Sequence, residues 1–324
     1  MSTKFRVLCA MTQGFEKLVI QCKGLGDVEF IDALAIDSLD QIENLNAVIA
    51  YAGRYTEELS QTVNRTRPKW IHLVTAGIDP LLKFPPPINT SISSSGYVWS
   101  ATVAEHAIAL LLALLRGLKP GIDLVKSNSW DRTTIMPKLS SIRHARILII
   151  GYGSIGRQIS KQLQGFEVEI TGLARTARTE IGVKVFAMHE LDNLITENDI
   201  VINCLPLCPA TQHVLSGTQF NLMRNDTIFI DVSRGGVVDE IALLEGLCNG
   251  RPAAAGLDVF EVEPLAITHA LRELDNVILT PHIAGFGSQQ VIDDMAIAAC
   301  DNLSDVLANN IPRDSLDLNQ AIIG

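Results

Sequence analysis

Residues 146–156 read RILIIGYGSIG, and this stretch decides the fold. Its first five residues include three isoleucines and predict a strand, while a helical pattern follows over Arg157–Gln164. Between the two, Gly151, Gly153 and Gly156 have the spacing of a loop that turns tightly and lets backbone approach a pyrophosphate. The N–H groups at the helix start, around Ser154 and Ile155, would receive the phosphates. The order strand, glycine loop, helix predicts a dinucleotide-binding Rossmann domain.

Alternating apolar runs and helical patterns extend on both sides of this loop, which predicts an α/β protein with two doubly wound domains. Strands are expected before it at Phe5–Cys9, Val28–Ile31, Ala47–Tyr51, Trp70–Val74 and Ile88–Ser91, with a helix over Thr56–Arg65. They are expected from it onward at Arg146–Ile150, Val168–Leu173, Asp199–Cys204, Thr227–Val232, Ala253–Leu257 and Val277–Thr280. The later strands carry few charges, as strands covered on both faces do.

Three segments between the two series have distinct compositions. Prolines over Phe84–Pro87 and serines over Ser91–Gly96 predict interruptions of regular structure. Ala101–Leu118 predicts a helix that is apolar on nearly every face, and we expect it to be buried between domains or subunits. Lys119–His144 is expected to be rich in loops.

Composition excludes several classes of protein. The chain has 324 residues and a net charge of −10, which argues against a nucleic-acid partner because a phosphate backbone needs a basic surface. We expect no membrane span, since the longest apolar run, Ala107–Leu115, is about half the required length and ends at Arg116. The start lacks the regions of a signal peptide. Six cysteines without paired spacing predict neither a metal site nor a structural disulfide, and a cytoplasmic protein is expected.

The exit of the second Rossmann strand indicates which cofactor binds. An NAD enzyme generally places an acid there for the ribose 2′-hydroxyl, but residues 174–178 read ARTAR and no acid occurs before Glu180. Arg175, Thr176 and Arg178 would bind a 2′-phosphate well. NADP(H) is therefore favoured, and NAD(H) is the alternative. In the plainer interpretation, Arg175 and Arg178 are solvated loop residues that bind no cofactor.

Three later segments each follow an expected strand and carry polar side chains at its end. They are DVSRGGVVDE over 231–240, GLDVFEVEP over 256–264 and TPHIAG over 280–285. Ligands of a doubly wound sheet bind beyond the carboxyl ends of its strands, so these segments are expected to converge on one crevice. Taken singly, the polar residues of these segments have plainer interpretations. Arg234 could be a surface ion-pair partner, Glu263 a loop residue and His282 a capping or packing residue.

Together with GYGSIG, these segments resemble the D-isomer-specific 2-hydroxyacid dehydrogenase family over essentially the whole chain. The resemblance implies a catalytic Arg234, Glu263 and His282. Arg234 would fix the carboxylate of a 2-keto acid and polarise its carbonyl. His282 would donate a proton to the carbonyl oxygen as hydride adds, and Glu263 would favour its imidazolium form and orient the ring.

The resemblance implies further site residues with less weight. Leu205, Pro206 and Thr211 match a loop beside the cofactor, Ser233 lies next to the nicotinamide side, and Asp258 matches a residue near the carboxamide or caps its strand. Backbone N–H groups around Ala76 and Gly77, in the segment TAGID, would bind the substrate together with Arg234 and His282. Ser95–Gly96 matches a second loop facing the site. Tyr97 and Trp99 follow it where many family members have smaller or amide residues, so the resemblance does not identify the substrate. His106 is expected to be structural.

The resemblance also implies a discontinuous architecture, in which the Rossmann domain over 99–285 is inserted in a flavodoxin-like substrate domain over 1–98 and 286–324. A helix at about Ser288–Ala308 would return the chain to that domain. The implied function is an NAD(P)-dependent 2-keto acid reductase closest to the NADPH-dependent glyoxylate and hydroxypyruvate reductases, acting as a homodimer. A dehydrogenase for another substrate, such as formate or phosphite, is an alternative within the same fold; Glu263 argues against formate, because formate-specific members carry an amide at that position. A dinucleotide-sensing binding protein, as among corepressor relatives, remains the alternative from another class.

Overall fold

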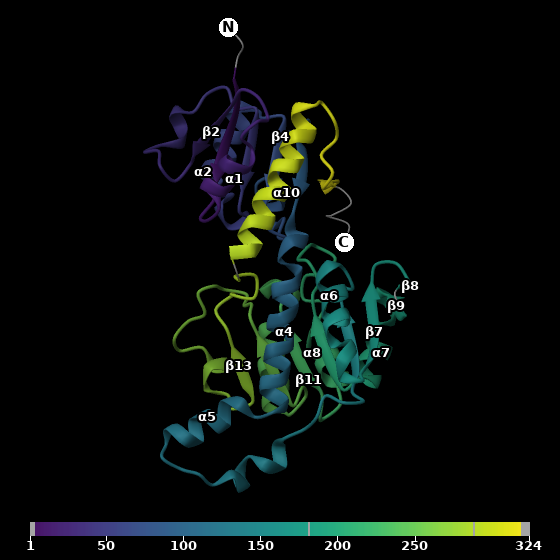
Figure 1. Ribbon diagram of the computed structural model, residues 1–324. Coiled ribbons are helices and arrows are strands. Elements are labelled where there is room, and N and C mark those ends of the chain that lie inside the picture. Colours follow the sequence, from purple (N-terminus) through teal and green to yellow (C-terminus); the bar gives the residue numbers. More distant parts are fainter. Residues whose placement is uncertain (1–3, 181, 288, 319–324) are drawn as a thin grey trace. The chain divides into compact units, whose positions relative to one another are not determined.

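A computed structural model describes residues 4–180, 182–287 and 289–318. The chain divides into two compact units, one of Met1–Trp99 with Gly287–Ile323 and one of Ser100–Phe286. Each unit has its own sheet (Figure 1). The expected start of the last helix at Ser288 lies outside the described residues.

The first unit holds a six-stranded sheet in the order β14-β5-β4-β3-β1-β2. All neighbours are parallel except β14 with β5. The run β2-β1-β3-β4-β5 is the flavodoxin-like order. The strands are β1 Phe5–Ala10, β2 Val28–Asp32, β3 Ala47–Ala50, β4 Trp70–Leu73, β5 Ser91–Ser94 and β14 Ser315–Leu316. The helices are α1 Phe15–Gln21, α2 Glu57–Thr66, α3 Asp79–Lys83 and α10 Gln289–Leu307.

A strand was predicted at Ile88–Ser91, and its bounds were wrong. The strand runs over Ser91–Ser94, inside the segment expected to be irregular, whereas Ile88 is fully exposed. Ser93 is tolerated at the centre of this buried strand because its hydroxyl binds polar side chains of β4. Ser93 Oγ accepts from Trp70 Nε1 at 2.8 Å and lies 2.8 Å from Nδ1 of the buried His72. Hydrogen-bond satisfaction therefore replaces apolar character at this strand.

The second unit holds an eight-stranded sheet in the order β13-β12-β11-β10-β6-β7-β9-β8, in which only β8 with β9 is antiparallel. Its chain crosses from β7 and β9 back to β10 beside β6, the reversal at which doubly wound sheets bind ligands. The strands are β6 Arg146–Ile150, β7 Glu169–Ala174, β8 Arg178–Glu180, β9 Val183–Ala187, β10 Ile200–Asn203, β11 Ile228–Asp231, β12 Ala254–Leu257 and β13 Val277–Leu279. The helices are α4 Ser100–Leu115, α5 Leu118–Lys126, α6 Ser154–Leu163, α7 Leu191–Glu197, α8 Gly217–Leu222 and α9 Glu240–Cys248.

Two expectations about residues 101–144 need correction. The apolar helix α4 ends at Leu115, and a separate helix, α5, occupies part of the segment expected to be loops. Residues 96–115 are also apolar and long enough to cross a membrane, although half of the apolar window is buried in the structure. Packing explains this composition, because α4 lies on α6, β11, β12 and β13. A Cβ added at Gly256 would lie 2.9 Å from Cβ of Leu110, so this helix approaches the sheet very closely.

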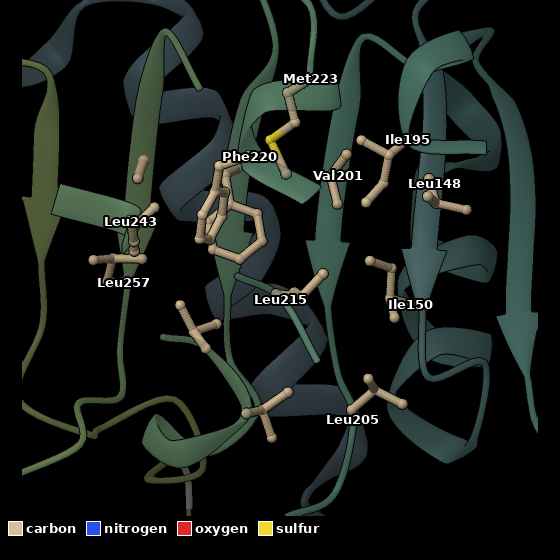
Figure 2. Packing of buried hydrophobic residues seen from close by; sticks show 14 of the residues in the cluster. Leu148, Ile150, Ile195, Val201, Leu205, Leu215, Phe220, Met223, Leu243 and Leu257 are labelled. Atoms are coloured by element: carbon tan, nitrogen blue, oxygen red, sulfur yellow. The ribbon is translucent and has the colours of Figure 1, made fainter. Parts of the chain in front are cut away.

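A hydrophobic core on the sheet of the second unit fixes the strand ends that follow. Figure 2 shows Phe220 and Met223 beside Val201 of β10, with Leu148 and Ile150 of β6 next to it. Phe220 and Phe229 meet edge to face, with ring centroids 5.7 Å apart. Close packing of this kind holds the backbone of neighbouring strands in fixed register, and with it the loops that leave them.

Candidate active site

The glycine loop is a tight turn pressed against the next strand. Gly151 has φ of 84°, a left-handed conformation that favours glycine, and a Cβ there would lie 2.7 Å from the carbonyl carbon of Cys204. The amides of Gly151 and Tyr152 both donate to the carbonyl oxygen of Leu173, at 2.9 and 2.8 Å. The loop is thereby fixed to the ends of β7 and β10.

Beyond the turn, the loop leaves open space at the start of α6. A Cβ on Gly153 would meet nothing closer than 4.0 Å, whereas a Cβ on Gly156 would lie 3.0 Å from the Ile149 side chain. The first amides of α6, at Ser154 and Ile155, have no acceptors within their own helix and lie at its positive end. An open glycine, a closely packed glycine and unpaired helix amides fit a dinucleotide pyrophosphate.

A buried polar cluster lies under this loop at the ends of β10 and β11. Asp231 Oδ1 accepts from Asn203 Nδ2 at 3.1 Å, from the Ser233 amide at 3.0 Å and from Ser233 Oγ at 2.6 Å. Asn203 Oδ1 in turn accepts from the amide of Leu205 at 3.3 Å. Burial raises the pKa of Asp231 to about 7, although these hydrogen bonds act in the opposite direction. The cluster shapes the backbone that touches Gly151.

Asp231→Asn is expected to flatten part of the dependence of stability on pH. The folded-state pKa is about 7 and the ordinary value is 3.8, so between these values the native state binds more protons than the unfolded chain. Stability therefore falls as pH rises through this window and stays low above it. The free energy of unfolding of Asp231→Asn should exceed that of the natural protein by about 2 kcal/mol at pH 8. Urea unfolding of both proteins at pH 8 and at pH 4.5 tests this. An equal difference in the free energy of unfolding at the two pH values would contradict it.

The loop over 205–211 is closed on itself by one threonine. Thr211 Oγ1 donates to the carbonyl oxygen of Pro206 at 2.6 Å and accepts from the amide of Cys208 at 2.9 Å. Leu205 and Thr211 are buried. The structure thus brings Leu205, Pro206 and Thr211 to the edge of the sheet from which the glycine loop leaves.

The arginines expected to bind a 2′-phosphate lie beside the glycine loop in different environments. Arg175 and Thr176 are exposed. Arg178 is half-buried and donates to the carbonyl oxygens of Tyr152 and Thr176, at 2.8 and 3.2 Å, and to Glu180. Sequence reasoning missed Glu180 because β8 and β9 were not predicted, and only the period-two spacing of 178 and 180 could have indicated the pair.

His282 and Glu263 form a direct pair at the ends of β13 and β12. His282 Nδ1 lies 2.7 Å from Glu263 Oε2, and Glu263 Oε1 accepts from the amide of Phe260 at 3.0 Å. Burial alone would raise the pKa of Glu263, but the hydrogen bond and charge of His282 outweigh it and hold that pKa below its usual range. Because Nδ1 faces the carboxylate, Nε2 is the ring nitrogen left to face a ligand. A cavity of about 620 Å³ is lined by this pair together with Leu265, Arg272 and Leu279, and neither Arg234 nor the glycine loop is part of its lining.

Asp258 holds the segment that carries His282. Its buried carboxylate accepts from Thr280 Oγ1 at 2.6 Å and from the amides of Ile283 and Ala284 at 2.9 and 2.8 Å. His106 of α4 lies 2.9 Å from Thr280 Oγ1 and 3.4 Å from Asp258. Burial would raise the pKa of Asp258, but these hydrogen bonds hold it below its usual range. This geometry favours the strand-end capping role for Asp258 and a positioning role for His106.

Arg234 lies on a turn that is pressed against the segment leading to Glu263. Its Nη1 donates to the carbonyl oxygen of Ser233 at 2.7 Å. A Cβ on the next residue, Gly235, would lie 1.9 Å from the carbonyl oxygen of Phe260. Arg234, Glu263 and His282 thus leave three adjacent parallel strands at one edge of the sheet, and backbone contacts fix two of their loops together.

The expected substrate loop of the first unit is equally constrained. A Cβ on Gly96 would lie 2.2 Å from Cα of Ala76, so the two loops are in backbone contact. Ser94 Oγ donates to the carbonyl oxygen of Thr75 at 3.0 Å and accepts from the amide of Gly96 at 3.1 Å. Ala76 and Gly96 are therefore held together at the ends of β4 and β5, and Gly77 follows Ala76 in the same loop.

Comparison with known proteins identifies the family. Residues 108–284 match the D-isomer specific 2-hydroxyacid dehydrogenase NAD-binding domain. The chain is 36% identical over 224 residues to glyoxylate/hydroxypyruvate reductase B of Salmonella newport, covering 68% of each chain.

Solved structures share the whole fold. The NADPH-dependent glyoxylate/hydroxypyruvate reductase of Sinorhizobium meliloti, crystallised with NADP and sulfate, aligns with a TM-score of 0.82 at 21% identity over 97% of this chain and 98% of its own. A protein from Thermus thermophilus aligns with a TM-score of 0.80 at 26% identity, over 97% of this chain and 100% of its own.

These matches do not favour the dinucleotide-sensing alternative. They indicate an oxidoreductase that transfers hydride with a nicotinamide cofactor. The chain belongs to the D-isomer-specific 2-hydroxyacid dehydrogenase family.

Proposed function

We propose that the protein reduces small 2-keto acids of the glyoxylate and hydroxypyruvate type to D-2-hydroxyacids, with NADP(H) favoured and NAD(H) as the alternative. The observation that carries this proposal is the 2.7 Å pair of His282 Nδ1 and Glu263 Oε2 at the ends of neighbouring strands that also carry Arg234 beside them. The names of the curated relatives and the NADP bound to the Sinorhizobium structure support the choice of substrate and cofactor.

Each side chain has a definite task in this reaction. Arg234 binds the substrate carboxylate and polarises the carbonyl. A reduced nicotinamide, when bound, would supply the hydride that adds to the carbonyl carbon, and negative charge would then develop on the carbonyl oxygen. His282 transfers its Nε2 proton to that oxygen, which gives the hydroxyl, and regains a proton from solvent. The anionic Glu263 stabilises the imidazolium and keeps Nδ1 occupied.

The cofactor would be held by residues that surround the glycine loop. Gly151, Gly153 and Gly156 with the amides of Ser154 and Ile155 would bind the pyrophosphate. The ribose end would face Arg175, Thr176 and Arg178, and the nicotinamide end would lie among the remaining five candidates. These are Leu205, Pro206, Thr211, Ser233 and Asp258.

A panel assay tests this function. The purified protein is mixed with NADPH or NADH and with glyoxylate, hydroxypyruvate, pyruvate or phenylpyruvate, and absorbance of the reduced cofactor is followed. We expect turnover of glyoxylate and of hydroxypyruvate to exceed that of phenylpyruvate. No turnover with any acid would refute the reductase proposal, and a tenfold preference for NADH would refute the cofactor preference.

We also propose a cytoplasmic homodimer, formed through an apolar arm over residues 116–139. Leu118, Ile122 and Val125 on α5 are about half exposed, and α5 has no buried residue of its own. The arm lines a largely apolar cavity of about 600 Å³. It carries five basic and two acidic residues in a chain of net charge −10, so a second copy offers complementary charge.

Ile122→Glu is expected to convert the dimer to a monomer, since it places a charge in the centre of an apolar interface. Light scattering after size exclusion gives the molar mass. Ile20→Glu, at an equally exposed isoleucine of the first unit, is the matched control and should remain dimeric. A natural protein that is already monomeric at micromolar concentration would contradict the proposal.

A further inference from the structure

The carboxylate of Glu180 is shared between two arginines beside the glycine loop. Arg157 on α6 donates from Nε to Oε1 and from Nη2 to Oε2, the latter at 3.3 Å. Arg178 Nε donates to Oε2 at 2.9 Å. Positions 178 and 180 lie on the same face of β8, so the strand itself places this carboxylate beside the guanidinium.

Arg178 links this group to the cofactor loop. Its Nη2 donates to the carbonyl oxygen of Tyr152, which stands between Gly151 and Gly153, and its Nη1 donates to that of Thr176. Three of the five guanidinium N–H groups therefore have identified acceptors: Glu180 and two carbonyl oxygens. Arg178 is thus held at the exit of β7, where a doubly wound sheet places the ribose of a dinucleotide.

The charges at this exit are mixed. Arg157, Arg175 and Arg178 contribute three positive charges, and Glu180 contributes one negative charge among them. Arg157 first, and Arg178 second, hold the pKa of Glu180 below its usual range, so the carboxylate stays anionic at neutral pH. A phosphate monoester at this position would meet a guanidinium that is already paired and an anion beside it.

We propose that Glu180 is a specificity-determining residue that limits the preference for a 2′-phosphorylated cofactor, because it competes with the 2′-phosphate for Arg178 and repels it. Arg178 therefore supports two cofactors: a 2′-phosphate draws it from Glu180, whereas a 2′-hydroxyl leaves the pair intact. This inference rests on the proposed function, which assigns the ribose to the exit of β7.

Glu180→Gln tests the inference because glutamine keeps a carbonyl acceptor for Arg178 while removing the charge. Dissociation constants for NADPH, NADH and 2′,5′-ADP are measured by isothermal titration calorimetry with the full chain. We expect Glu180→Gln to bind NADPH and 2′,5′-ADP about five times more tightly and NADH within about twofold. The gain should shrink in high salt, since exposed charges are screened over about 10 Å at 0.1 M.

Glu167→Gln is the matched control. Glu167 pairs with Arg143 at 2.7 Å on the same unit, so its replacement makes the same chemical change at a different arginine. It should leave the ratio of the NADH and NADPH dissociation constants unchanged.

The outcomes separate the inference from the function on which it rests. An unchanged ratio in Glu180→Gln would overturn the inference alone. A ratio shifted toward NADH would also overturn it. Weaker binding of NADH alone would overturn it in another way, by indicating that Glu180 binds the ribose 2′-hydroxyl. Failure of the natural protein to bind any dinucleotide would overturn the proposed function together with the inference.

Discussion

Replacing His282 by alanine is expected to lower kcat/KM for 2-keto acids about 10³-fold while leaving the dissociation constant for NADPH within about twofold. The ring is the proton donor in the proposed reaction, and its Nδ1 is already paired with Glu263. Nothing in the geometry gives His282 a contact with the glycine loop, so the two measurements should separate. Steady-state kinetics and calorimetry on the same preparation provide them.

A second variant guards against a purely structural loss. His282 has φ of 53°, a left-handed conformation that asparagine tolerates better than alanine. His282→Asn should therefore keep the thermal midpoint of the natural protein and still lose activity. His189→Ala, at an exposed histidine paired only with Glu190 among the described residues, is the control. Retention of more than a tenth of the activity in His282→Asn would exclude the proton-donor role.

Gly235→Ala is the other change with a large expected effect. The new Cβ would lie 1.9 Å from the carbonyl oxygen and 2.0 Å from the carbonyl carbon of Phe260, both backbone atoms that cannot rotate away. The turn bearing Arg234 and the segment leading to Glu263 must then separate. We expect a loss of about 3 kcal/mol in the free energy of unfolding. A misplacement of about 1 Å between the two side chains should cost about 10² in kcat/KM.

Gly236 supplies the control because it is the adjacent glycine in the same turn. A Cβ there would lie 3.3 Å from the two terminal carbons of Leu207, the flexible end of a side chain. Gly236→Ala should therefore retain most of its stability and activity. Denaturant unfolding and kinetics of the two variants, side by side, decide the matter. Equal effects would show that backbone contact with Phe260 is not what aligns Arg234.

The sequence predicted the frame of the molecule well because the frame depends on period and order. Strands of β-branched residues, a glycine loop and polar strand ends are local features, and the structure confirms the α/β class and the doubly wound sheets. Prediction from the sequence failed where tertiary contacts override the local preference of a segment. The serine-rich segment of β5 resembles a loop in the sequence, but the side chains of Trp70 and His72 form hydrogen bonds with the hydroxyl of Ser93 in the folded strand.

The same limit applies to the site. Arg234, Glu263 and His282 each follow an expected strand of one sheet, which predicts that they converge on one crevice. The structure places His282 Nδ1 2.7 Å from Glu263 Oε2. The hydrogen bonds that position the neighbouring segments could not be predicted from the sequence. Which oxygen Asp258 offers to which amide depends on loop geometry. That Glu180 faces Arg178 depends on the hairpin of β8 and β9, which was not predicted.

The discontinuity of the first unit has a consequence for how the chain matures during synthesis. Residues 100–286 form one continuous unit and can complete their sheet as soon as they leave the ribosome. The first 99 residues cannot finish at that time. Their strand β5 pairs with β14, which Ser315–Leu316 form near the end of the chain. The side chains of Met295 and Ile292 on α10 pack against Gly14. The half made first is therefore completed last, and its unpaired strand edge stays exposed to aggregation until then.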